Sequence, residues 1–223
     1  MSNISDNIRS IQTQIPSGVE LVAVSKTMPN SDILEAYSVG QRVFGENKVQ
    51  DLVAKEEALP KDIEWHFIGH LQTNKVKYIA PFVSLIHAVD GFKLLKEINK
   101  QAIRHNRIIS CLLQFHIATE DSKFGLNISE ADELLNSEGF KGLTNVKISG
   151  VMGMATYTDD LAQVENEFSN LKSIFDQLKE KHFSNDTEFK HISMGMSGDF
   201  KIAIEKGSTM IRIGSTIFGA RNY

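Results

Sequence analysis

Three stretches of the sequence carry residue types that could attack a carbonyl group or hold an anion. In the first, Lys26 follows the short apolar run Leu21–Val24 and precedes a turn at Pro29. Parallel α/β proteins bind their ligands outside the carboxyl ends of the strands. There a lysine amine can shift its pKa and form a Schiff base with an aldehyde. A solvated lysine at a strand end is the alternative, because lysine side chains are mostly exposed.

The second and third stretches, residues 193–199 and 211–216, are rich in glycine and hydroxyl groups. Their chemically notable residues are Ser197, Arg212, Gly214 and Ser215. Glycine lets the backbone approach an anion, and a hydroxyl and the free N–H groups of a helix start can bind it. Taken singly, each stretch could equally be an ordinary turn or cap. Together with Lys26, they predict a site for a small aldehyde that carries a phosphate.

Apolar residues recur at spacings that predict alternating strands and helices along the whole chain. A first helix is predicted over Ser5–Ile15. The predicted strands are Leu21–Val24, Arg42–Glu46, Trp65–Gly69, Val83–Val89, Ile108–Ile117, Val146–Met154, Phe189–Met194 and Met210–Ile213. The clearest helical patterns between them are Asn47–Leu59, Gln72–Ile79, Phe92–Ala102, Asp160–His182 and Asp199–Lys206. Helix caps are expected within residues 29–32, at Ser129 and at Asp160.

Strict alternation of strands and helices predicts a parallel sheet, because each crossover between parallel strands needs a helix. A doubly wound open sheet and a closed barrel both satisfy this pattern. A count near eight and the chain length favour a (β/α)8 TIM barrel with an additional amino-terminal helix, as a single domain over residues 1–223. Closure would pair the first strand with the last. Lys26 would then face the loop Gly214–Gly219.

Composition narrows the classes of partner and compartment. The 223 residues are 41% hydrophobic and 23% charged, which is typical of a globular protein with one core. A net charge of -4 gives no general attraction to nucleic acid. No segment approaches the length of a membrane span or resembles a signal peptide, so we expect no membrane partner and a cytoplasmic location. The single cysteine, Cys111, lies in an apolar run and is expected to be a small buried side chain.

Other cofactor and metal motifs are weak or absent. The sequence contains neither a phosphate-binding G-x-x-x-x-G-K-[ST] loop nor a G-x-G-x-x-G turn after a strand. His66 and His70 are four residues apart, but the apolar run around them predicts a strand and turn, so no metal site is expected. The strand-end methionines are expected to fill the barrel mouth. They are Met152, Met154, Met194 and Met196.

Six motifs, in order along the chain, resemble those of the pyridoxal phosphate homeostasis protein family. They are Val24–Thr27, Phe44–Asn47, Trp65–Lys75, Gly150–Ala155, Ser193–Ser197 and Arg212–Gly219. The resemblance extends from Leu21 to Arg221. It implies a barrel similar to the amino-terminal domain of alanine racemase, with pyridoxal 5'-phosphate bound covalently.

The resemblance also implies a role for individual residues. Lys26 matches the Schiff-base lysine of the family, and Asn47 falls in the motif that lines the cofactor ring. Ser197, with the backbone at Gly214 and Ser215, matches the phosphate-binding positions. Arg212 matches the arginine beside the pyridine nitrogen.

The resemblance implies a non-catalytic protein that buffers or delivers pyridoxal phosphate, with cofactor-dependent apoenzymes as possible recipients, and so affects amino- and keto-acid metabolism. A small amino-acid racemase is the main alternative. An aldolase-type barrel that uses Lys26 on a sugar phosphate is a third, less favoured because no acid–base partner lies beside this lysine in sequence. A monomer is expected, since the carboxyl-terminal domain of the racemases has no counterpart here.

Overall fold

Eight parallel strands form a closed barrel in the computed structural model, which describes residues 3–119 and 124–219. The strands are β1 (Glu20–Val24), β2 (Val43–Glu46), β3 (Glu64–Phe67), β4 (Leu85–Val89), β5 (Ile109–Gln114), β6 (Val146–Met152), β7 (His191–Ser193) and β8 (Met210–Ile213). Each strand pairs with its sequence neighbour, and β8 returns to pair with β1. The predicted (β/α)8 barrel is therefore confirmed.

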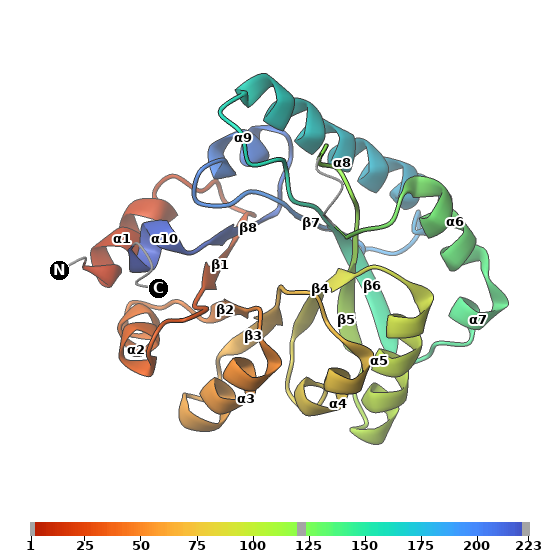
Figure 1. The fold of residues 1–223 in the computed structure, drawn as a ribbon, viewed down its shortest axis with the longest axis horizontal. Helices are drawn as coiled ribbons and strands as arrows, with labels where there is room; N and C mark the ends of the chain where they lie inside the picture. Colours follow the sequence, from red (N-terminus) through yellow and green to blue (C-terminus); the bar gives the residue numbers. More distant parts are fainter. Residues whose placement is uncertain (1–2, 120–123, 220–223) are drawn as a thin grey trace.

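The helices surround the barrel (Figure 1). They are α1 (Ile4–Gln12), α2 (Asn30–Ser38), α3 (Val49–Ala58), η1 (Thr73–Lys75), α4 (Val76–Ile79), α5 (Phe92–Arg104), α6 (Ile128–Asn136), α7 (Glu138–Lys141), α8 (Leu161–His182), α9 (Phe200–Glu205) and α10 (Ser215–Phe218). Within this described part of the chain, no helix is both long and apolar enough to cross a bilayer.

Side chains on the strands alternate between two cores, as a pleated parallel barrel requires. An outer core between strands and helices contains the large rings of the protein, including Phe44, Trp65 and Phe168. Inside the barrel is a smaller apolar cluster. It consists of Val22, Leu85, Ala88, Leu112, Met152 and Met210. Cys111 is fully buried in the outer core, which confirms the expectation of a small buried side chain, and burial raises the pKa of its thiol.

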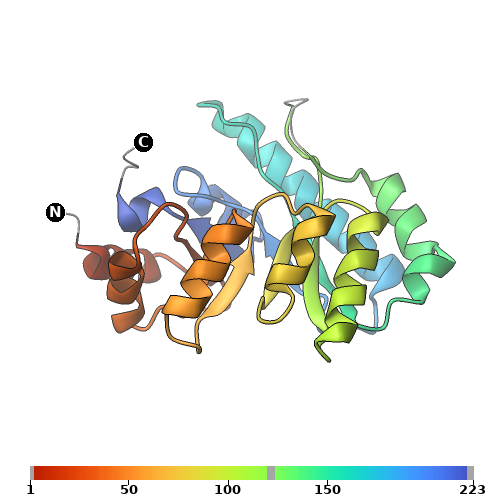
Figure 2. The same ribbon diagram turned by 60° about the horizontal axis from the view of Figure 1, so that its bottom comes forward.

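The additional helix α1 covers the seam between the first and last units of the barrel. Its buried residues Ile4, Ile8 and Ile11 face α2 and α10. The Asn7 side chain also donates a hydrogen bond of 2.8 Å to the carbonyl of Ile217 in α10. Figure 2 shows α1 beside α10, at the end of the molecule where the chain begins and ends. Helix α1 therefore packs the first part of the chain against its last helix, α10.

Several predicted boundaries were too long because tertiary pairing ends the elements earlier. The helix predicted to reach Ile15 ends at Gln12. The strand predicted to reach Ile117 ends at Gln114, since Phe115 instead forms an isolated bridge with Leu126. The strand predicted over Phe189–Met194 contains only the three residues of β7, and the helical pattern over Gln72–Ile79 is the 3-10 turn η1 followed by α4.

Two of the expected caps are wrong. Pro29 caps α2 without any side-chain hydrogen bond, so the polar residues after it do not act as the cap. Helix α6 begins with Asn127 rather than Ser129, and the side chains of Asn127 and Glu130 each accept from the other's backbone N–H. The expected cap at Asp160 is confirmed, because its side chain accepts from the Gln163 N–H.

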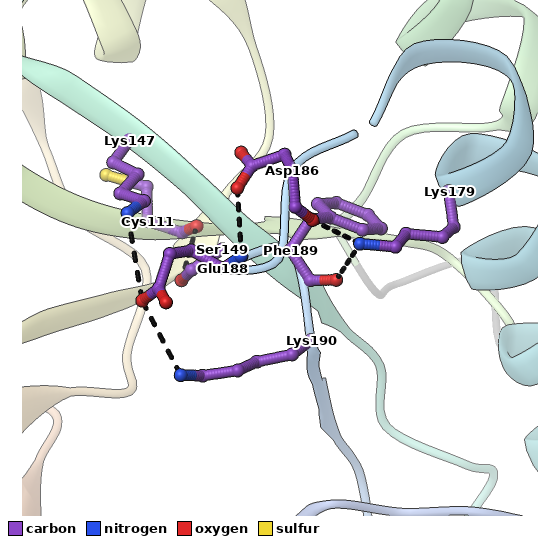
Figure 3. Close-up of polar contacts among 8 residues, drawn as sticks. All are labelled: Cys111, Lys147, Ser149, Lys179, Asp186, Glu188, Phe189 and Lys190. Atoms are coloured by element: carbon purple, nitrogen blue, oxygen red, sulfur yellow. Dashed lines mark hydrogen bonds and ion pairs between the residues drawn. The ribbon is translucent and has the colours of Figure 1, made fainter. Parts of the chain in front are cut away.

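Lysine contacts fix the turn between α8 and β7 at the amino-terminal end of the barrel (Figure 3). Lys179 of α8 donates to the carbonyl oxygens of Asp186 and Phe189, the second at 3.0 Å. Glu188 lies between Lys147 and Lys190, with N–O distances of 3.7 and 3.5 Å. These contacts set where β7 begins, and so which of its residues point into the barrel.

Gly150 of β6 is the position at which the sheet least tolerates a side chain. Its φ is +154°, and a Cβ built there would lie 1.9 Å from the carbonyl oxygen of His191. The neighbouring pairing shifts register between Cys111 and Leu112, the residue opposite Gly150. The close approach of β6 and β7 therefore depends on glycine.

We expect Gly150→Ala to lower the free energy of unfolding by at least about 2 kcal/mol, because β6 and β7 must separate to admit the methyl group. Urea unfolding followed by circular dichroism measures the change. Gly198→Ala is the matched control, since nothing lies within 4 Å of a Cβ there. Equal stabilities of the two variants would contradict this account.

Candidate functional site

A cavity of about 850 Å³ opens at the carboxyl ends of the strands. All six residues that the sequence singled out line it. They are Lys26, Asn47, Ser197, Arg212, Gly214 and Ser215. They come from the ends of β1 and β2, from the loop after β7 and from β8 with the turn that follows it. Barrel closure has therefore brought together residues from both ends of the chain.

Lys26 follows β1 on a tightly held segment of backbone. The N–H of Ser25 donates to the carbonyl of Gly45 at 3.0 Å, which continues the pairing with β2. The N–H of Met28 donates back to Ser25 at 3.0 Å and closes a turn. Within this turn Thr27 has a φ of +68°, a costly conformation for a β-branched residue. Such strain persists only where the surrounding structure enforces it, so the backbone on both sides of Lys26 is held in one conformation.

A buried ion pair lies directly behind this segment. Lys55 of α3 places its Nζ 2.6 Å from Oε1 of Glu46 and 2.8 Å from the carbonyl oxygen of Ser25. The Ser25 hydroxyl donates to the same Glu46 oxygen at 2.6 Å. Glu46 is fully buried, and its Oε2 has no hydrogen-bond partner among the residues described. The pair fastens the residue before Lys26 to both β2 and α3.

Hydrogen-bond donors converge on the loop side of the cavity. The hydroxyl oxygen of Ser197 lies 3.3 Å from the N–H of Gly214 and 3.5 Å from that of Thr216, at the start of α10. The N–H of Met196 donates to the Asp199 carboxylate at 2.5 Å, which closes the loop after β7. The Ser197 hydroxyl thus accepts from two backbone amides, and this cluster of a hydroxyl and backbone N–H groups is of the kind that binds a phosphate group.

Arg212 forms a buried cationic wall of the cavity. It is only 5% exposed, and it donates to the Ser193 hydroxyl at 2.5 Å and to the Gly153 carbonyl at 3.1 Å. Burial lowers the pKa of its guanidinium to about 10, although Asp199 acts in the opposite direction. Arg212 is therefore a cation at neutral pH.

Asn47 reaches the cavity because the next loop has no side chain in its way. A Cβ on Gly69, in the loop after β3, would lie 2.5 Å from the Asn47 carbonyl oxygen. The two loops can therefore cross in contact. This close approach is the structural reason for the glycine in the Trp65–Lys75 motif.

Exposed rings stand around the cavity mouth. Phe124 is 58% exposed and stacks on His70 with the ring centroids 4.7 Å apart. Tyr157 is 99% exposed, although the loop that carries it is anchored. The adjacent Thr156 donates to Glu167 of α8 from its N–H at 2.6 Å and from its hydroxyl at 2.7 Å. The mouth is therefore open to solvent but framed by a fixed loop.

The structure corrects the interpretation of the methionines and adds residues that sequence reasoning missed. Met152, Met154 and Met196 line the cavity, but Met194 is buried in the outer core. Gln114, at the end of β5, also lines the cavity and had no recognisable signal in its apolar strand. Among the residues described, no group of three or more His, Cys, Asp or Glu side chains could hold a metal ion.

The arrangement fits a compact ligand that combines an aldehyde, an anion and a hydrogen-bond acceptor. Lys26 supplies a primary amine, and the Ser197 loop with the Gly214 turn supplies donors for an anion. Arg212 supplies a buried donor that cannot accept a hydrogen bond. This donor set matches the aldehyde, phosphate and ring nitrogen of pyridoxal 5'-phosphate.

Comparison with known sequences agrees with this geometry. The sequence model described as "Alanine racemase, N-terminal domain" matches residues 1–222. The pyridoxal phosphate homeostasis protein of Aquifex aeolicus is 41% identical over 92% of this chain and 88% of its own. That of Escherichia coli strain K12 is 35% identical over 100% of this chain and 99% of its own. The family resemblance read from the motifs is confirmed.

Solved structures give the same relationship. PipY of Synechococcus elongatus, solved with PLP bound, superposes with a TM-score of 0.86 at 32% identity and covers 97% of this chain and 100% of its own. Alanine racemase from Bartonella henselae superposes with a TM-score of 0.74 at 15% identity and covers 98% of this chain but 58% of its own. The second similarity concerns the barrel fold alone.

The buried ion pair behind Lys26 yields a test of stability. We expect Lys55→Met to lower the free energy of unfolding by about 3–5 kcal/mol, because Glu46 would keep a buried charge without its cation. Lys61→Met is the matched control. It removes an exposed lysine whose ion pair with Glu56 is 2.9 Å long, and we expect a change within about 1 kcal/mol.

Urea unfolding of both variants measures the difference, and the double variant Lys55→Met, Glu46→Gln supplies a check. Neutralising both partners should recover part of the lost stability, since the isolated charge is the main cost. If Lys55→Met and Lys61→Met lower the free energy of unfolding equally, the buried pair stabilises the fold no more than the exposed one.

Proposed function

The chain belongs to the pyridoxal phosphate homeostasis protein family, and we propose that it binds pyridoxal 5'-phosphate as a Schiff base on Lys26 and takes part in the homeostasis of this cofactor. The observation that carries the proposal is the meeting of Lys26, the Ser197 loop and Arg212 on one cavity. Pyridoxal phosphate, when bound, supplies an aldehyde that condenses reversibly with an amine.

Each residue has a distinct part in holding the cofactor. The Lys26 amine is the covalent anchor, on a segment whose backbone is fixed by the Glu46–Lys55 pair. The Ser197 hydroxyl and the backbone amides at Gly214 and Ser215 would hold the phosphate at the start of α10. Asn47 would line the ring, and Arg212 would donate a hydrogen bond to the ring nitrogen.

Arg212 also limits how strongly the cofactor would be activated. A guanidinium can only donate hydrogen bonds, so a ring nitrogen facing it would accept one and would be unprotonated. An unprotonated ring is a weaker electron sink than one paired with a carboxylate. The residue therefore holds the cofactor without strongly activating it.

The open mouth extends the proposal to cofactor delivery. Phe124 and Tyr157 stand exposed around the entrance to the cavity of about 850 Å³, which leaves a route for loading and release. We assign the protein to the cytoplasm, as a monomer that passes the cofactor to pyridoxal phosphate-dependent apoenzymes.

The anchor is tested by its absorption. Wild-type protein mixed with pyridoxal phosphate should acquire a visible band, and Lys26→Ala should lose it and bind the cofactor at least about tenfold more weakly, because the covalent link is gone. Lys61→Ala, which removes an exposed surface lysine, should leave the band unchanged. Borohydride reduction followed by peptide mass spectrometry locates the modified residue. Retention of the band in Lys26→Ala would refute the anchor.

The racemase alternative is tested by turnover. We expect purified protein loaded with pyridoxal phosphate to racemise common L-amino acids no faster than the Lys26→Ala variant under the same conditions, because Arg212 weakens the electron sink. Chiral chromatography of the products measures the rate. Robust turnover that depends on Lys26 would replace the storage function with a racemase.

A further inference from the structure

A chain of buried polar side chains runs through the barrel interior, beyond the residues that line the cofactor cavity. Arg212 donates to the hydroxyl of Ser193 at 2.5 Å. That hydroxyl lies 3.0 Å from Nδ1 of His87, whose Nε2 lies 3.1 Å from Nδ1 of His66. All four residues are at most 5% exposed. The contacts link β8, β7, β4 and β3 across the barrel.

The chemistry of the guanidinium gives this chain a direction. Arg212 can only donate, so the Ser193 oxygen accepts from it. Within the described part of the chain, His87 Nδ1 is the only acceptor placed for the hydrogen of that hydroxyl. His87 must then carry its own proton on Nε2 and donate to His66 Nδ1, which leaves the His66 proton on Nε2.

Both histidines are held neutral by their surroundings. Burial, with a smaller effect of His191, lowers the pKa of His66 to about 3. Burial, with the nearby His66, Arg212 and His191, places the pKa of His87 well below its ordinary value. At neutral pH the chain therefore keeps one protonation state and one donor direction.

The chain ends beside a second cavity, of about 180 Å³, at the amino-terminal end of the barrel. His66 lines it together with charged residues at or near the amino-terminal ends of several strands. These are Glu20, Glu64, Lys147 and Glu188. Glu188 is paired with two lysines, as Figure 3 shows. The hydrogen-bonded chain thus runs between the two mouths of the barrel, and polar surroundings are available at both of its ends.

We propose that His87, supported by His66, is a positioning residue that orients Arg212 toward the cofactor through the hydroxyl of Ser193. This inference rests on the proposed binding of pyridoxal phosphate. His87 fixes the rotation of the Ser193 hydroxyl, so that its lone pairs face Arg212. The guanidinium is then held at Ser193 and Gly153, with its remaining N–H groups available to the cavity.

A first test uses the protein without cofactor. Nitrogen-15 NMR of labelled histidines distinguishes the two neutral tautomers. We expect His87 and His66 to be protonated on Nε2 throughout pH 5–8. Protonation of His87 on Nδ1, or a charged His87 in this range, would overturn the inference, because the donor direction would be reversed or broken.

A second test uses the protein loaded with pyridoxal phosphate and two variants of His87. His87→Leu removes the acceptor for Ser193, whereas His87→Gln can still accept at one end and donate at the other. We expect His87→Leu to shift the visible band and to release the cofactor at least about fivefold faster. We expect His87→Gln to remain within about twofold of wild type, and His105→Gln, at an exposed residue that caps α5 far from the chain of contacts, to match wild type.

The outcomes separate this inference from the proposed function. A wild-type protein that does not load pyridoxal phosphate overturns the proposed function itself. Loading with an unchanged band and release rate in His87→Leu overturns the positioning role alone. If His87→Leu does not fold, Ser193→Ala breaks the same chain one residue nearer Arg212 and should give the same shift and faster release. An unchanged Ser193→Ala would then overturn the inference.

Discussion

The pairing of β1 with β8 is the constraint on which the rest of the structure depends. Val22 lies opposite Arg212, and Ala23 lies opposite Ile213. This register sets Gly214 against the end of β1, where a Cβ would lie 3.4 Å from Val24. The proposed lysine anchor from one end of the chain and the proposed anion-binding turns from the other meet only because the barrel closes in this register.

Closure also explains the two buried polar assemblies. Barrel interiors are usually filled with apolar side chains. Here His66, His87, Ser193 and Arg212 occupy part of the interior beside its apolar cluster, and each is paired with the next. The Glu46–Lys55 pair is also buried, behind the residue that precedes Lys26. Oε2 of Glu46 has no hydrogen-bond partner among the described residues. Both assemblies reduce apolar packing, and both adjoin a residue that we assign to cofactor binding.

The charges of the cavity suit the binding of an anionic cofactor. Arg212 remains a cation despite its burial, and the Ser197 loop adds neutral donors. These groups favour a phosphate and an unprotonated ring. The exposed rings of Phe124 and Tyr157 leave the mouth accessible. A protein that stores and passes on a cofactor needs this combination of firm anchoring and an open entrance.

The sequence by itself determined the alternation of strands and helices and the candidate residues at the strand ends. Hydrophobic periodicity and the glycine and hydroxyl groups near the carboxyl terminus are local signals, so Lys26, Ser197 and Gly214 could be found without coordinates. The number of units then predicted closure, and closure predicted that these residues meet. The motifs supplied the roles of Asn47 and Arg212 by resemblance.

Only the tertiary structure decided the partners of the buried polar residues and the ends of several elements. His87 and Ser193 are single polar residues in short strands. No feature of the neighbouring sequence distinguishes them from buried polar residues that make ordinary hydrogen bonds in a core. They meet because closure places β4 and β7 around one interior, and β4 shifts register between Ile86 and Val89, the stretch that carries His87. In the same way β5 ends at Gln114, and the next residue, Phe115, forms an isolated bridge with Leu126. Such contacts depend on register between segments far apart in sequence, which local periodicity does not encode.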